Sequence, residues 1–122
     1  MESPSFRWLR WIQLGLTLAI YSYAYLLPAP FGGRVGFVGD AQLHTIGTAL
    51  LFLSLYVAAH ERLRLWALAA LACVVSLCFE YAQSFSPIRV FDWADFGGNV
   101  IGVGVGALII AACHARGWLR RT

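Results

Sequence analysis

The chain has 122 residues, which is enough for one domain. Hydrophobic residues make up 60% of it and charged residues only 12%, against roughly 25% in a soluble globular domain, so we expect an integral membrane protein. All nine basic residues are arginine, which excludes chemistry that needs a lysine. Because the arginines flank apolar runs instead of forming a basic face, we expect no nucleic-acid partner.

Four apolar runs follow one another along the chain, each close to the roughly 20 residues that a helix needs to cross a bilayer. The first follows Arg7 and Arg10 as a secretory signal would, but it is longer than a signal's apolar region, so we expect it to stay as an anchor. The fold class is therefore all-α, an integral membrane four-helix bundle. The sequence predicts one transmembrane domain over 1–122, with helices at 8–27, 42–59, 65–85 and 94–113.

The arginines are divided unequally between the two sides of such a four-span chain. Only Arg34 and Arg89 fall on the side of the loops after the first and third helices. Short cytoplasmic segments are enriched in arginine, so we expect a protein of the inner (plasma) membrane with both termini cytoplasmic. The seven on the cytoplasmic side are Arg7, Arg10, Arg62, Arg64, Arg116, Arg120 and Arg121.

Each predicted helix has one stripe of polar or small residues at spacings of three and four, which places them on a single face. The stripes begin at Gln13, Asp40, Cys73 and Asp92. Lipid is a poor partner for such a face, since an ionised side chain at the bilayer centre costs roughly 3 kcal/mol on insertion scales. We therefore expect the stripes to meet in a pocket open at the outer membrane face. Its predicted members are Asp40, His44, Glu80, Gln83, Arg89, Asp92, Asp95 and Asn99.

The same residues resemble the VanZ-like family of small bacterial membrane proteins. Asp40 and His44 match its D-x-x-x-H element, although Ala41 stands where the family commonly has a basic residue. The resemblance spans roughly 40–106 and implies a multi-spanning envelope protein, in a family whose founding member is linked to teicoplanin resistance. The pattern E-x-x-Q-x-F-x-P-x-R and the turn and helix after it are matched by Glu80, Gln83, Phe85, Pro87, Arg89, Asp92, Asp95, Asn99 and Gly102.

Several of these residues have a structural alternative beside the functional one. Asp92 is predicted to cap the fourth helix. Glu80, an acid inside a span, is the strongest functional candidate, and Arg89 is expected to pair with Glu80 or Asp95 or to bind an anionic head group. His44 is expected to hydrogen-bond with Asp40, one turn away. The less favoured alternative is a hard-cation or zinc site formed by these two residues with Glu80 and Asp95. We expect no metal and no cofactor, and we read the three cysteines as small buried hydrophobes.

Three functions fit these observations. We rank first a binding protein whose pocket takes a lipid head group, a lipid-linked cell-wall precursor or a glycopeptide. The alternative is a membrane-embedded enzyme, a hydrolase or transferase acting on a lipid-linked substrate. A transporter is disfavoured because the polar residues cluster at one face. Gly98, Gly102 and Gly106 form two G-x-x-x-G steps, which predict close helix packing inside one bundle or between the copies of a homo-oligomer.

Overall fold

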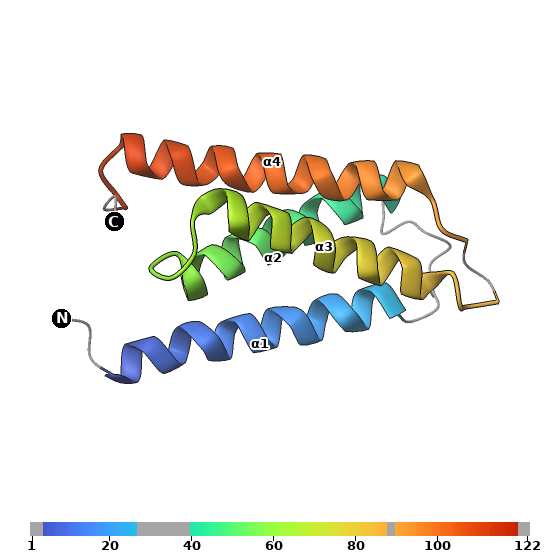
Figure 1. Cartoon of the computed structure of the whole chain (residues 1–122), viewed down its shortest axis with the longest axis horizontal. Helices are drawn as coiled ribbons and strands as arrows, with labels where there is room; N and C mark the ends of the chain where they lie inside the picture. The colour runs from blue at the N-terminus through green and yellow to red at the C-terminus, as the bar shows by residue number, and fades with distance from the viewer. Residues whose placement is uncertain (1–3, 27–39, 88–89, 120–122) are drawn as a thin grey trace.

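Four α-helices that alternate in direction make up the protein. The structure, a computed structural model, describes residues 4–26, 40–87 and 90–119, and its helices are α1 (Pro4–Leu26), α2 (Asp40–Ala59), α3 (Leu65–Gln83) and α4 (Trp93–Ala115). We call the end of the bundle where α1 begins and α4 finishes the terminal end, and the opposite end the loop end (Figure 1). The predicted all-α four-helix bundle is confirmed.

Three of the four helices are long and apolar enough to cross a membrane, namely α2, α3 and α4. The helix α1 is not among them, although its 23 residues give it sufficient length, because Arg10, Gln13 and its tyrosines lower the mean hydropathy. Its outward face is nevertheless apolar, since Leu16 and Ile20 are exposed. The chain is therefore a membrane protein with three such helices, and a fourth span through α1 stays a prediction.

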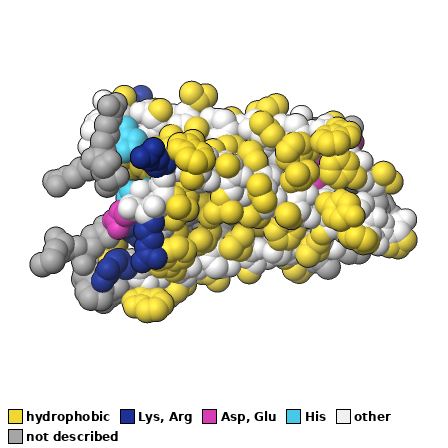
Figure 2. All heavy atoms as spheres, in the orientation of Figure 1, with side chains coloured by type: hydrophobic (Ala, Val, Ile, Leu, Met, Phe, Trp, Pro, Cys, Tyr) yellow, Lys and Arg dark blue, Asp and Glu magenta, His cyan; other side chains and the backbone are white. Residues whose placement is uncertain are grey.

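The surface matches a bilayer in its pattern. Hydrophobic side chains cover the visible face along most of its length, and arginine and histidine gather at the terminal end (Figure 2). Large exposed hydrophobics lie on all four helices, for example Leu16, Ile46, Val74 and Leu108. Apolar cover of this extent marks a surface that contacts lipid.

The helices α2 and α4 run parallel and pack closely through a glycine stripe on α4, which consists of Gly98, Gly102 and Gly106. A methyl carbon at Gly102 would overlap the carbonyl oxygen of Thr45 and lie 3.0 Å from the amide nitrogen of Ala49. At Gly98 and Gly106 it would come within 2.8 and 2.6 Å of atoms of α2. The stripe therefore packs inside one bundle. A homo-oligomer through these glycines, which the sequence allowed, would first have to displace α2.

A polar ladder joins α1 to α2 in the middle of the bundle. The Ser54 hydroxyl donates to Gln13 Oε1 at 2.6 Å and lies 3.0 Å from the hydroxyl of Thr17. The amide of Gln13 returns a hydrogen bond to the backbone carbonyl of Ser54 at 3.0 Å. The stripe on the first helix thus faces inward, as its spacing predicts, and its polar atoms are satisfied away from lipid.

The helix limits differ from the predicted ones by a few residues. The helix α3 ends at Gln83 instead of residue 85, because the amides of Ser84 and Ser86 bond three residues back, at 3.0 and 2.9 Å, in a tighter turn. The helix α1 starts four residues before the predicted position, α2 starts two before, and α4 continues two beyond. None of these shifts moves a polar stripe to another face.

Candidate functional site

A polar cluster lies inside the bundle near its loop end, and every helix contributes to it. Its members are Tyr25 of α1, His44 of α2, Glu80 of α3, and Asp95 and Asn99 of α4. Because the helices alternate in direction, the last turns of α1 and α3 lie beside the first turns of α2 and α4 (Figure 1). Residues far apart in sequence therefore meet at one height.

The imidazole of His44 lies between two carboxylates. Its Nδ1 is 3.5 Å from Oε2 of Glu80, and its Nε2 is 3.7 Å from Oδ2 of Asp95. The side chain of Glu80 is fully buried, whereas that of Asp95 retains 15% exposure. The row of three titratable groups therefore runs from the interior of the bundle toward its surface at the loop end.

Hydrogen bonds through Asn99 fix the protons around this row. Its Oδ1 accepts from the hydroxyls of Tyr25 at 2.6 Å and Thr48 at 2.7 Å. Each hydroxyl has one proton to give, so Tyr21 must be the donor in its 3.1 Å contact with Thr48. By the same reasoning, His44 Nδ1 must be the donor in its 2.6 Å contact with Tyr25. The imidazole therefore has a proton on Nδ1, and its Nε2 pairs with Oδ2 of Asp95 when it is protonated as well.

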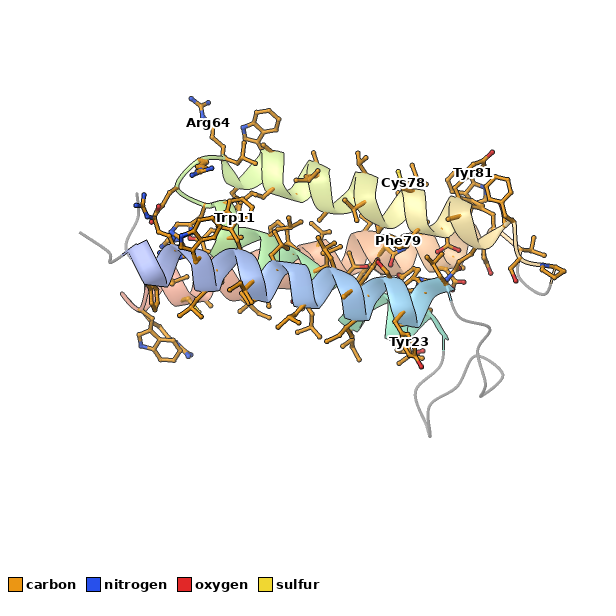
Figure 3. All side chains as sticks on the ribbon, turned by 90° about the horizontal axis from the view of Figure 1, so that it is seen from below. Trp11, Tyr23, Arg64, Cys78, Phe79 and Tyr81 are labelled. Carbon is orange, nitrogen blue, oxygen red and sulfur yellow. The ribbon has the colours of Figure 1, made fainter. Side chains whose placement is uncertain are left out.

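Aromatic rings enclose the cluster on the side of α1 and α3. Tyr21 and Tyr25 stack with centroids 4.3 Å apart, and Tyr25 meets the His44 ring edge-on at 4.7 Å. Phe79 packs against Tyr21 at 5.2 Å, and it points toward α1 while the neighbouring Cys78 and Tyr81 point away (Figure 3). Such a wall excludes water and strengthens the electrostatic interactions behind it.

Two further predicted site residues have structural contacts. Gln83 is buried and donates from Nε2 to the backbone carbonyl of Tyr25 at 2.8 Å, so it ties the ends of α1 and α3 together. Asp92 is exposed and accepts from the amide of Ala94 at 2.8 Å, which makes it the N-cap of α4. The capping role that the sequence favours for Asp92 agrees with this contact, and Asp92 is separate from the cluster.

The remaining two predicted site residues fall outside what the structure describes. Arg89 lies in the undescribed segment 88–89, so its pairing with Glu80 or Asp95 stays a prediction. Asp40 is the first residue of α2, but its side chain is not described. The hydroxyl of Ser84, the C-cap residue of α3, donates to the carbonyl of Tyr81 at 2.6 Å.

Sequence reasoning missed the tyrosines and threonine of the network. Tyr21, Tyr25 and Thr48 lie on the polar stripes of the first and second predicted helices, but they are not among the predicted members of the pocket. The available signal was their spacing, since Tyr21 and Tyr25 are four residues apart, as are His44 and Thr48. The helices α1 and α2 follow each other along the chain and both have polar residues every four positions. This spacing predicts that polar residues of the two helices contact each other at successive turns.

The chemistry of the cluster favours proton donors as ligands. Two carboxylates and one imidazole can accept hydrogen bonds from hydroxyl or ammonium groups, and the imidazole can also transfer a proton. Within the described ranges, no group of three or more His, Cys, Asp or Glu side chains is arranged to hold a metal ion. The zinc or hard-cation alternative also includes Asp40, whose side chain the structure does not describe, so this alternative stays a prediction.

Comparison with known proteins identifies one family. The VanZ/LLP1 family model matches residues 10–114, which is most of the chain and includes every member of the cluster. No curated protein and no solved structure matches it.

Proposed function

The chain belongs to the VanZ/LLP1 family, and from that premise we propose that it binds a ligand of the bacterial cell envelope at its loop end. The observation that supports this best is the position of His44 between Glu80 and Asp95 in the interior of an apolar bundle. Ionisable groups inside a membrane protein are costly to bury and usually mark a binding or transport site. Packing alone would be served as well by apolar side chains of the same size.

The charge of the cluster indicates the kind of ligand. Glu80 and Asp95 supply carboxylate acceptors, and Asp95 is the part of the row that retains exposure. A lipid-linked cell-wall precursor or a glycopeptide of the teicoplanin type carries sugar hydroxyl and amino groups that can donate to such acceptors. The arginine distribution supports a position of the loop end at the outer face of the plasma membrane, where such ligands are found.

The test uses two acids three residues apart at the start of α4, its N-cap Asp92 and Asp95 in its first turn. Asp95→Asn removes a charge from the cluster, whereas Asp92→Asn removes the same charge from an exposed cap and keeps a residue that caps equally well. Each variant is purified in detergent, and binding of a lipid-linked peptidoglycan precursor and of teicoplanin is measured by native mass spectrometry. We expect Asp95→Asn to lower the affinity about tenfold or more and Asp92→Asn to leave it unchanged.

Two results would contradict the proposal. If wild-type protein binds neither probe more tightly than it binds a neutral phospholipid, the proposed ligands are excluded. An equal loss in both variants would mean that the acids act through net charge at this end of the bundle and that the cluster has no specific role.

A catalytic role is the second candidate, and the position of His44 favours it. An imidazole held between the carboxylates of Glu80 and Asp95 is a group suited to general acid–base work on a bound hydroxyl. Incubation of a lipid-linked precursor with wild type and with His44→Gln separates the two candidates. Loss of product with retained binding in His44→Gln supports an enzyme, and absence of any product from wild type supports binding alone.

A further inference from the structure

A second polar site lies at the terminal end, at the opposite end of the bundle from the cluster. A groove of about 560 Å³ opens between the turn that joins α2 to α3 and the last turns of α4. Its polar lining consists of Tyr56, His60, Glu61, Arg62, Arg64 and His114. The function proposed above uses none of these residues.

The groove is cationic because Glu61, the acid in its lining, pairs with Arg10, an arginine outside the lining. Glu61 accepts from Arg10 of α1 at 3.0 Å, and this contact holds the pKa of Glu61 below its ordinary value. Arg62 and Arg64 then supply the charge of the lining. The guanidinium of Arg62 lies over the ring of Trp11 at 5.7 Å, and Arg64 points away from the bundle beside the start of α3 (Figure 3).

The wall of the groove is held by its own hydrogen bonds. His114 Nδ1 lies 3.1 Å from the carbonyl of Leu119, and His60 Nδ1 lies 3.0 Å from the carbonyl of Tyr56. A carbonyl can only accept, so both histidines have their protons on Nδ1. The hydroxyl of Tyr56 therefore donates to Nε2 of neutral His114 at 2.8 Å. These hydrogen bonds hold one wall of the groove, and Arg62 and Arg64 belong to its lining.

The tryptophans place this groove at the height of the lipid head groups. Four of the five tryptophans lie at the terminal end, and all four are exposed: Trp8, Trp11, Trp66 and Trp118. Exposed tryptophans form belts at the boundary between hydrocarbon and head groups. The groove, whose lining includes Arg64 and Leu65 directly before Trp66, therefore lies near the layer that contains the lipid phosphates.

We propose that the groove binds the phosphate of an anionic phospholipid from the surrounding leaflet, between Arg62 and Arg64. A guanidinium matches phosphate oxygens with paired hydrogen bonds, and basic pockets at the ends of transmembrane helices are a common form of lipid site. The first turn of α3 contains no acid and its N-cap residue, Arg64, makes no side-chain capping bond. The partial positive charge of that helix end adds to the attraction.

The test compares two double variants that remove the same charge from the same end. The groove variant, Arg62→Gln/Arg64→Gln, removes both arginines of the lining. The control variant, Arg7→Gln/Arg116→Gln, removes two arginines that do not line the groove. Binding of phosphatidylglycerol and of phosphatidylcholine with identical acyl chains is measured by native mass spectrometry. We expect wild type and the control to prefer phosphatidylglycerol, and the groove variant to lose about tenfold or more of that affinity.

Three results would overturn the proposal. An equal loss in both double variants would indicate diffuse attraction, and equal binding of the two lipids by wild type would indicate contact with acyl chains alone. Competition by inorganic phosphate at the concentration of the lipid would make the occupant a soluble anion. Since Arg64 is exposed, Arg64→Gln alone provides a folded variant in which the loss must already be visible if the double variant does not fold.

Discussion

The hydroxyl of Tyr25 in α1 lies 2.6 Å from Oδ1 of Asn99 in α4, a residue 74 positions further along the chain. The same hydroxyl lies 2.6 Å from Nδ1 of His44 in α2, and the backbone carbonyl of Tyr25 accepts from Gln83 of α3. One residue near the end of α1 thus joins all four helices. It also sets the proton position on the imidazole of the candidate site.

Replacing Tyr25 by phenylalanine tests this junction. Tyr25→Phe keeps the ring that stacks on Tyr21 but removes the hydroxyl, which leaves buried groups of His44 and Asn99 without that partner. We expect the protein in detergent to lose about 1–2 kcal/mol of stability, measured by thermal unfolding. Tyr23→Phe, at an exposed position two residues away, should leave the midpoint unchanged, and an equal shift in both variants would argue against the junction.

The glycine stripe predicts a large difference between two alanine substitutions on one helix. Gly102→Ala places a methyl group against the backbone of Thr45 and Ala49, which cannot move aside as a flexible side chain could. We expect a loss of about 1–3 kcal/mol, typical of overpacking. Gly104 has open space where the methyl group would lie, so Gly104→Ala should be neutral or slightly stabilising. Thermal unfolding that ranks the two in the opposite order would refute the close approach of α2 and α4.

The pair of Arg10 and Glu61 predicts a pH dependence at the terminal end. Arg10 donates to Glu61 and lowers the pKa of that carboxyl below its ordinary value of 4.5. A depressed folded pKa gives stability that is present above the unfolded pKa and is lost as pH falls through the folded one. Wild type should therefore unfold slightly later than Glu61→Gln near neutral pH, with the difference vanishing below about 4.5.

The pair is partly exposed, so added salt should shrink that difference. Thermal midpoints of the two proteins are measured across the acidic range at low and high salt. A gap between them that widens as the pH falls would show that Glu61 is stabilised in its protonated form, against the contact with Arg10.

The sequence was sufficient for the helices and for the meeting of their polar faces. Spacings of three and four identified the inward stripes, and the scarcity of charge identified lipid as the solvent around them. The stripes predicted a pocket that includes His44, Glu80, Asp95 and Asn99. The structure brings these four residues together, and whether they bind a ligand stays a prediction. Asp92 could also be read as a cap, because an acid directly before a helix accepts from its first amides.

Other features depend on distances that periodicity does not contain. A stripe gives the face on which Tyr25 lies, but the pairing of its hydroxyl with Asn99 requires the relative height of two helices far apart in sequence. From the sequence alone, the glycine stripe could equally have packed against a second copy of the chain. The structure shows that α2 packs against it. Likewise, the groove beside Arg62 results from a short turn and an unrelated helix end, which share no sequence pattern.

The orientation of the bundle can be tested by labelling single cysteines. All five arginines that the structure describes lie at the terminal end, with the turn between α2 and α3, so we expect that side to be cytoplasmic. In a background without the three native cysteines, Ser86→Cys at the loop end should react with a membrane-impermeant maleimide added to intact cells. Arg62→Cys at the terminal end should react only after the cells are opened.

The two positions control for each other, since each lies outside the helices and must label in opened cells if the protein is folded and present. Removing one arginine by Arg62→Cys leaves six on the predicted inner side against two on the other, so the bias that sets the topology is preserved. Labelling at residue 62 and not at residue 86 in intact cells would reverse the orientation. The candidate site would then face the cytoplasm, where a glycopeptide does not reach it, and the ligand would have to be sought among molecules of the inner leaflet.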